Sequence, residues 1–449
     1  MPGINFRQAV SMGVGAMVGG GIFAVLGIAI QVAGRAVILS YIIAGIIALA
    51  SGYSYAKLTL YLNDEGGSFT FLEYFLNDDR PAAFVGWTLI LGYIGSIAMY
   101  AYTFGAFSAE MIAEYLPVSK FIIRLVVSLL VLAIFLIINL QGIQSSAESE
   151  FWMVFLKMLI LFIVSIIGLV SLALHPAIAS GATTFFSKGY TAPILAISTI
   201  FVSYQGFQLL SYEYEEMEDR EHLIMRGIIT SILISATIYL LISFVTSTIV
   251  PPKLIKQKGE TVLAYVLFNV FSSSVLKQIS FVVIVIAALF STASAINATL
   301  FGTARLAARI AGDHDLPAIF SFKDKSQTIP THSLIIITVI TALLTGLGSL
   351  KEITGFASLS FLIIFFVVSW VLIRTDKIDY KKPIVYVSLF GTPIVIVLYL
   401  VNLVLHNLRE LFLTLGIYGA ILVMVLLFFE EQHHQPKNKQ NIASSSQNT

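Results

Sequence analysis

Long apolar runs separated by short polar joints dominate this sequence. Each run is long enough for a helix that crosses a bilayer, since about 20 apolar residues suffice. We place the runs at Gln8–Val32, Ala36–Leu62, Ala82–Ile112, Phe121–Leu140, Phe151–Leu174, Ala192–Tyr212, Arg226–Val250, Lys277–Arg309, His332–Leu350, Ile353–Ile373, Pro383–His406 and Leu411–Phe429. The pattern predicts an all-α polytopic membrane protein with 12 transmembrane helices.

Two segments outside these runs have their own patterns. The connection Pro251–Ser274 contains an apolar stretch, Val262–Phe271, that is too short to span a bilayer. We expect it to form an outer-surface helix that covers a pathway. The tail Glu430–Thr449 is polar and rich in Ser, Gln and Asn, and we expect it to be disordered.

Composition agrees with the membrane class and excludes several functions. Of 449 residues 57% are hydrophobic and only 11% are charged, whereas soluble proteins are about 25% charged. The net charge of +1 provides no footprint for nucleic acid. Cysteine is absent, and we find neither a metal-binding His–Glu pattern on a helix nor a nucleophile–base pair. We therefore expect no enzyme activity, no cofactor and no metal.

Loop charges predict the orientation in the membrane. If the N-terminus is inside, 15 of the 26 Lys and Arg residues fall on the cytoplasmic side and 10 fall outside. This bias favours both termini in the cytoplasm.

The first apolar run contains an unusual cluster of glycines in the segment Gly13–Phe23. Each glycine weakens a helix by roughly 1 kcal/mol relative to alanine, and three of them follow one another at Gly19–Gly21. Unwound backbone survives in a membrane only where it is buried in protein or lines a cavity. A broken helix that holds a solute is one interpretation, and close packing of helices through small residues is the other.

The sixth run repeats the anomaly at Ser203–Phe207, where polar side chains and a glycine lie at mid-membrane depth. A buried polar face bonded to neighbouring helices is the alternative explanation. However, interrupted helices at corresponding positions of two halves are the best sequence indication of a transporter site. The first and sixth positions predict two five-helix units, residues 1–174 and 192–373, followed by two extra helices within 383–429. Because five is odd, the second unit is inverted relative to the first.

Several motifs, in this order and spacing, resemble the amino acid–polyamine–organocation (APC) superfamily of permeases, which have a five-plus-five inverted-repeat fold. The resemblance covers about Phe6 to Phe429. An acidic stretch after the sixth run also resembles the family, although the usual prolines are missing there. The matching segments are Gly15–Phe23, Ser203–Phe207, Glu215–Arg220, Ser291–Arg305 and Gly312–Pro317.

The resemblance implies a site for an amino acid at the two breaks. The freed amides of the first helix would receive the substrate carboxylate, because the positive end of a helix dipole favours an anion. These amides belong to Met17, Val18, Gly19, Gly20 and Gly21. Carbonyls near Phe201, Val202 and Tyr204 would accept hydrogen bonds from the ammonium group. The expected pocket walls are Tyr93 and Ser96, and the expected lids are Tyr204 and Phe207.

Lys157 stands within an apolar run, about 10 Å of helix beyond Glu150. From the sequence pattern alone it could reach the cytoplasmic interface with its long side chain or act inside the membrane, where ionisable residues are functional candidates. Proton-coupled members that this chain resembles place a lysine where sodium-coupled relatives bind a cation. The resemblance therefore implies a proton-coupling group made of Lys157, the Gly15 carbonyl and the hydroxyls of Ser291 and Ser294.

These observations predict a secondary transporter of the cell membrane that imports amino acids together with protons by alternating access. We expect broad specificity for neutral side chains, because no acidic residue lies firmly at the pocket. An amino-acid or amine exchanger of the same fold is the alternative. A channel is disfavoured because no run presents a regular polar stripe.

Overall fold

The computed structural model describes residues 3–63, 67–75, 79–142, 147–181, 184–312, 316–323 and 329–433. Within these ranges the chain forms helices joined by loops, with no strand beyond a single backbone bridge between Ile4 and Met217. Residues 313–315 of the predicted Gly312–Pro317 motif lie outside the described residues, as does the predicted tail from 434 onward.

Each predicted span coincides with one helix or with a set of consecutive helices. Six of the uninterrupted ones are α3 (Val37–Leu62), α5 (Asp79–Ile112), α6 (Lys120–Leu140), α7 (Ala147–Leu174), α9 (Arg220–Ile249) and α12 (Ser274–Gly312). The others are α13 (Thr331–Leu347), α14 (Leu350–Arg374), α15 (Lys382–His406) and α16 (Leu408–His433), which continues past the expected end at Phe429. Within the described ranges, 9 segments are long and apolar enough to cross a membrane, and α13 is a shorter apolar helix.

The first and sixth predicted spans are the interrupted ones. The first consists of α1 (Phe6–Met17) and α2 (Gly21–Ala33), followed by the short turn η1 (Gly34–Ala36). The sixth consists of α8 (Ala192–Ile200), η3 (Phe201–Tyr204) and η4 (Phe207–Glu216). The segment after this break is a 3₁₀ helix of 10 residues, although 3₁₀ helices longer than 3–4 residues are uncommon.

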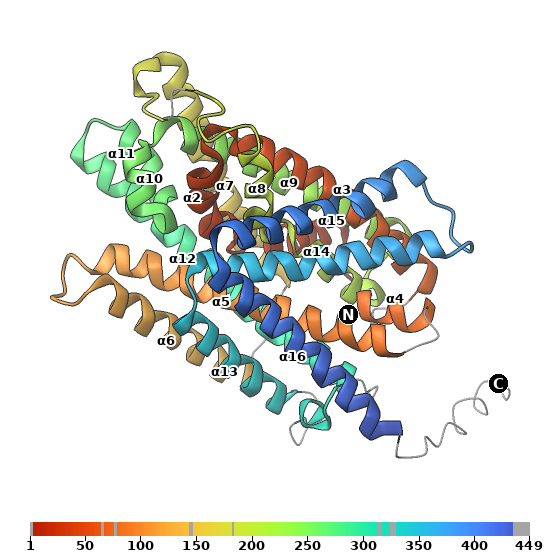
Figure 1. Ribbon diagram of the computed structural model, residues 1–449. Coiled ribbons are helices and arrows are strands. Elements are labelled where there is room, and N and C mark those ends of the chain that lie inside the picture. The colour runs from red at the N-terminus through yellow and green to blue at the C-terminus, as the bar shows by residue number, and fades with distance from the viewer. Residues whose placement is uncertain are drawn as a thin grey trace.

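The interrupted helices lie in the interior of the bundle. α2 packs against α8, and α1 packs against α9. In the most apolar part of α5 and of Ala192–Glu216, 83% of the residues are buried, against only 28% in α6 and in α15. Figure 1 shows α6 and α13 side by side along one edge of the bundle. The outer helices therefore present apolar side chains to the surroundings, as a bilayer requires.

Two contacts relate distant parts of the chain. The Ile4 amide donates to the Glu216 carbonyl at 2.7 Å, and the Glu218 amide donates to the Ile4 carbonyl at 3.1 Å. The start of α1 and the end of η4 therefore lie at the same face of the bundle. This agrees with the six predicted spans between them, because an even number of crossings returns the chain to the side on which it began.

The connection that we expected to cover a pathway folds as three short helices, α10 (Pro252–Lys258), η5 (Gly259–Tyr265) and α11 (Val266–Val270). It packs on α2, where a side chain on Gly27 would lie 1.9 Å from the Gly259 carbonyl oxygen. The Gln31 side chain also donates to the Ile255 carbonyl at 2.9 Å. The segment therefore lies directly on the second half of the first broken helix.

Candidate functional site

The first break is short and centred on Gly19 and Gly20. α1 ends at Met17, and the Val18 amide still donates to the Val14 carbonyl at 2.8 Å. α2 begins at Gly21, so the amides of its first turn have no acceptor inside the helix. Of the five amides in the predicted set, those from Gly19 to Gly21 therefore lie in the break or at the start of α2, whereas Met17 and Val18 belong to the end of α1.

The second break is made by Gln205 and Gly206. Gly206 has φ +127°, a conformation that L side chains rarely adopt. Its amide donates to Oε1 of Gln208 at 2.7 Å, which satisfies a group that the break frees. Just before the break, the Val202 amide donates to Ser358 Oγ at 3.0 Å, so a side chain of α14 replaces a helical acceptor. Phe201, Val202 and Tyr204 are all buried in η3.

The two breaks touch each other. A Cβ on Gly21 would lie 2.7 Å from the Cα of Ser203, and a Cβ on Gly206 would lie 2.7 Å from the Cβ of Ala16. The Tyr239 hydroxyl on α9 is 2.8 Å from both the Met17 carbonyl and the Ser203 carbonyl. The glycines therefore fit both interpretations of the sequence. They interrupt the helices, and they also allow the two interrupted segments to pack closely together.

Lys157 is 4% exposed, and its Nζ donates to the Gly15 carbonyl at 3.0 Å. This carbonyl is near the C-terminal end of α1, where the helix dipole is negative and attracts a cation. The Ser291 hydroxyl donates to the Val18 carbonyl at 2.7 Å, one turn further along α1. Ser294 is half-buried on the same helix as Ser291. The side chains of Lys157 and Ser291 therefore approach the end of α1 at different carbonyls.

The predicted wall and lid residues surround the breaks, but their polar atoms bind other parts of the protein. Tyr93 accepts a hydrogen bond from Gln208 Nε2 at 3.2 Å, and Ser96 donates to the carbonyl of Gly92 at 3.0 Å. The Tyr204 hydroxyl donates to the Tyr41 carbonyl at 2.8 Å. The Phe207 ring meets the Tyr55 ring edge to face and lies tilted against the Phe365 ring.

Two aromatic residues at the breaks were absent from the predicted set. Tyr239 joins the two breaks, as described above. The Tyr100 ring lies against Gly20, where a Cβ would be 2.2 Å from the ring, and its hydroxyl accepts a hydrogen bond from Gln205 Nε2 at 2.7 Å. A tyrosine in the middle of an apolar span was the available signal for both, because a buried hydroxyl needs a hydrogen-bond partner there.

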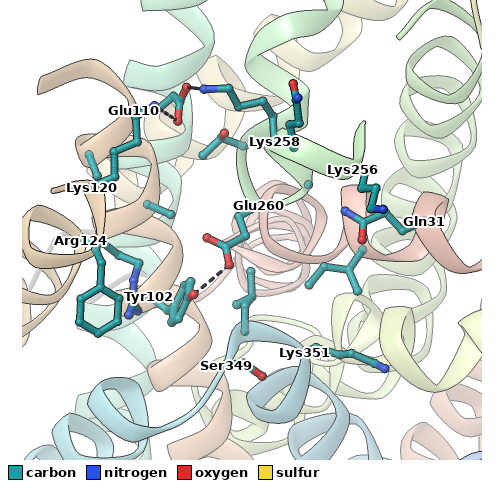
Figure 2. Close-up of a pocket in the computed structure, with 18 residues that line it drawn as sticks. Gln31, Tyr102, Glu110, Lys120, Arg124, Lys256, Lys258, Glu260, Ser349 and Lys351 are labelled. Atoms are coloured by element: carbon teal, nitrogen blue, oxygen red, sulfur yellow. Dashed lines mark hydrogen bonds and ion pairs between the residues drawn. The ribbon is translucent and has the colours of Figure 1, made fainter. Parts of the chain in front are cut away.

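A cavity of about 550 Å³ lies at the end of the broken helix farthest from the N-terminus. Figure 2 shows Glu110 between Lys120 and Lys258, and Tyr102 pointing toward Glu260. Glu110 of α5 is paired with Lys258 of α10 and accepts from Lys120 of α6 at 2.9 Å. These ion pairs connect α5 and α6 to the segment that lies on α2.

In the part of the chain that the structure describes, no three His, Cys, Asp or Glu residues are grouped as they would be to hold a metal ion. The polar groups that converge on the breaks are backbone amides and carbonyls, hydroxyls, two side-chain amides and one ammonium. Amides and carbonyls can bind the two ends of a small zwitterion, and an ammonium can release a proton.

Comparisons with known proteins agree with this chemistry. The family model described as "Amino acid permease" matches residues 4–435. Uncharacterized protein MJ0609 of Methanocaldococcus jannaschii is 29% identical over 95% of this chain and 94% of its own length. The inner membrane transport protein YbaT of Escherichia coli is 28% identical over 94% and 95%. Cationic amino acid transporter 7, chloroplastic, of Arabidopsis thaliana is 26% identical over 85% and 67%. The chain therefore belongs to the amino acid permease family within the APC superfamily.

Proposed function

We propose that this permease imports amino acids together with protons, and that Lys157 is the proton-carrying group. The observation that carries the proposal is the hydrogen bond of 3.0 Å from buried Lys157 Nζ to the Gly15 carbonyl. A charged group in the membrane interior is costly and is retained for function. Lysine, unlike a bound sodium ion, can lose its positive charge by releasing a proton.

The substrate site in this proposal lies beside the contact between the two breaks. The amides of Gly19, Gly20 and Gly21, at the positive end of α2, receive the carboxylate. Carbonyls of η3 accept hydrogen bonds from the ammonium group. Because backbone atoms bind the groups that all α-amino acids share, specificity depends on the surrounding side chains, which are aromatic or small at Tyr93, Ser96 and Phe207. We therefore propose neutral amino acids as substrates.

Coupling follows from the position of the proton site on α1. Lys157 contacts Gly15, and the proposed substrate amides begin only a few residues later in the same chain segment. A change in charge at Lys157 therefore acts on the carbonyl end of α1, which adjoins the substrate amides. In our proposal Lys157 is protonated while the outward site is loaded and releases its proton toward the cytoplasm.

Alternating access requires that the site open to each side in turn. We propose that residues 1–174 and 192–373 are inverted five-helix repeats that rock about the midplane breaks. In this arrangement both termini face the cytoplasm and the protein resides in the cell membrane. The contact between Ile4 and Met217 supports one part of this arrangement, in which the start of α1 and the end of η4 lie on the same side of the membrane.

Reconstitution into liposomes tests the proposal. Purified protein in empty liposomes should accumulate radiolabelled alanine when an inward proton gradient is imposed, without internal amino acid. Lys157→Ala should abolish this accumulation. An exchanger would instead require internal substrate, and proton-driven accumulation by Lys157→Ala equal to that of the wild type would disprove the role of the lysine.

A further inference from the structure

Glu150 is a half-buried titratable group that has no role in the proton-coupling step proposed above. It precedes Lys157 by seven residues on α7, which is about two turns and about 10 Å of helix. Glu150, Val154 and Lys157 therefore follow one face of α7. Glu150 is half-buried, whereas Val154 and Lys157 are both 4% exposed.

All three side chains meet the same residue of α1. Lys157 Nζ binds the Gly15 carbonyl at 3.0 Å. A Cβ on Gly15 would lie 2.7 Å from Val154 Cγ2 and 3.6 Å from Oε1 of Glu150. The carboxylate and the ammonium thus approach Gly15 from two sides, with Val154 between them on α7.

The helix direction brings the two groups closer than their spacing suggests. Side chains on an α-helix lean toward its N-terminus, so the long Lys157 side chain extends back along α7 toward Glu150. Both groups reach Gly15, so their charges lie in the same buried region. Four methylene groups allow the ammonium to leave the Gly15 carbonyl and swing toward the carboxylate.

The other charged residues near this end of α7 lie on elements that pack against it, which include α1, α9 and α12. At this end of the bundle they are Arg7 on α1, Arg220, Glu221, His222 and Arg226 on α9, and Arg305 and Arg309 on α12. Among the described residues, Lys157 is the charged partner of Glu150. Two glutamates, Glu148 and Glu150, lie between Lys157 and the N-terminal end of α7, and Glu150 is the one nearer to the lysine.

We propose that Glu150 is the group that accepts the proton from Lys157 and passes it to the cytoplasm. In this step an N–H bond of the ammonium breaks, and its electron pair stays on Nζ. An O–H bond forms on the Glu150 carboxylate, so an ion pair becomes two neutral groups. The carboxylic acid then releases the proton to water at the half-buried end of α7. This inference rests on the proposed proton-coupled function.

Removing the acceptor should slow proton release without removing the substrate site. Positioned acids and bases typically accelerate proton transfer about 100-fold or more. We therefore expect Glu150→Gln to slow uptake driven by a proton gradient by about 100-fold. Counterflow of labelled alanine against internal unlabelled alanine, which needs no net proton release, should remain within about twofold of the wild-type rate.

The experiment measures both activities in proteoliposomes for the wild type, Glu150→Gln, Glu150→Asp and Lys157→Ala. Glu221→Gln, an exposed carboxylate change at the start of α9, is the matched control and should leave both rates unchanged. Glu150→Asp should recover part of the proton-driven uptake. Internal imidazole, a small diffusible proton acceptor, should accelerate net uptake by Glu150→Gln but not by Lys157→Ala.

Two results would overturn the inference. One is net uptake by Glu150→Gln equal to that of the wild type, while Lys157→Ala loses its coupling. The other is loss of counterflow and net uptake to the same extent without rescue by imidazole, which would indicate a structural role. Normal coupling in Lys157→Ala would instead refute the proposed function itself, so the two failures are distinguishable.

Discussion

Gly206→Ala is the substitution that most severely tests the contact between the two breaks. The new Cβ would lie 2.7 Å from Ala16 Cβ, 2.8 Å from the Ala16 carbonyl carbon and 2.9 Å from the Met17 amide. Two of these atoms are backbone, so no flexible side chain can move aside. The alanine would also hold φ near +127°, which costs about 1–3 kcal/mol. Overpacking adds about 1–3 kcal/mol, giving a total of about 2–6 kcal/mol.

The assay compares thermal unfolding in detergent and equilibrium binding of radiolabelled alanine. We expect Gly206→Ala to unfold at a lower temperature than the wild type and to lose most binding, because the breaks must separate. Gly302→Ala on α12 is the matched control, since a Cβ there would have no neighbour within 4 Å. It should be neutral or stabilise the helix by up to about 1 kcal/mol. Wild-type unfolding and binding by Gly206→Ala would refute the contact.

Three further predictions concern side chains around the breaks and the cavity. Tyr239→Phe removes the hydroxyl that lies 2.8 Å from a carbonyl of each break. The lost hydrogen bond should destabilise the protein by about 1–3 kcal/mol, which thermal unfolding would measure. An unchanged unfolding temperature would contradict this role. Ser291→Ala should raise the KM about tenfold, the equivalent of about 1.4 kcal/mol, with less effect from Ser294→Ala; equal effects of the two would argue against the Val18 contact. Glu110→Gln should loosen the segment over α2. The chain has no native cysteine and Thr261 is 4% exposed, so a cysteine placed at position 261 should react faster with an impermeant maleimide in the Glu110→Gln background. Equal reaction rates would show that the ion pairs do not hold the segment.

Helix positions were predictable because the bilayer imposes a minimum length on every apolar run. The predicted span Phe121–Leu140 and the helix Lys120–Leu140 differ by a single residue. The break sites were also predictable, since consecutive glycines and a Gln–Gly pair both weaken a helix locally. The family resemblance supplied the pairing of Lys157 with Gly15, which the structure then placed at 3.0 Å.

Contacts between spans were harder to predict, because they depend on how each helix is rotated about its axis. Ser291 binds the Val18 carbonyl rather than that of Gly15, a difference of about one helical turn. The apolar pattern cannot specify which carbonyl of α1 a hydroxyl on α12 reaches. Tyr239 was missed for the same reason, since its function depends on two carbonyls from distant segments.

The amide set was also predicted too broadly, because the sequence does not show where the last turn of α1 closes. The Val18 amide remains bonded to Val14 at 2.8 Å, which leaves the following glycines as the free part of the break.

Simultaneous recording of amino-acid and proton fluxes tests the central claim most directly. Alanine added outside proteoliposomes that contain no substrate should cause alkalinisation of the medium in proportion to alanine uptake. The account predicts this proton movement in the wild type and its loss in Lys157→Ala. Alanine uptake without any proton movement in the wild type, or proton movement that persists unchanged in Lys157→Ala, would contradict it.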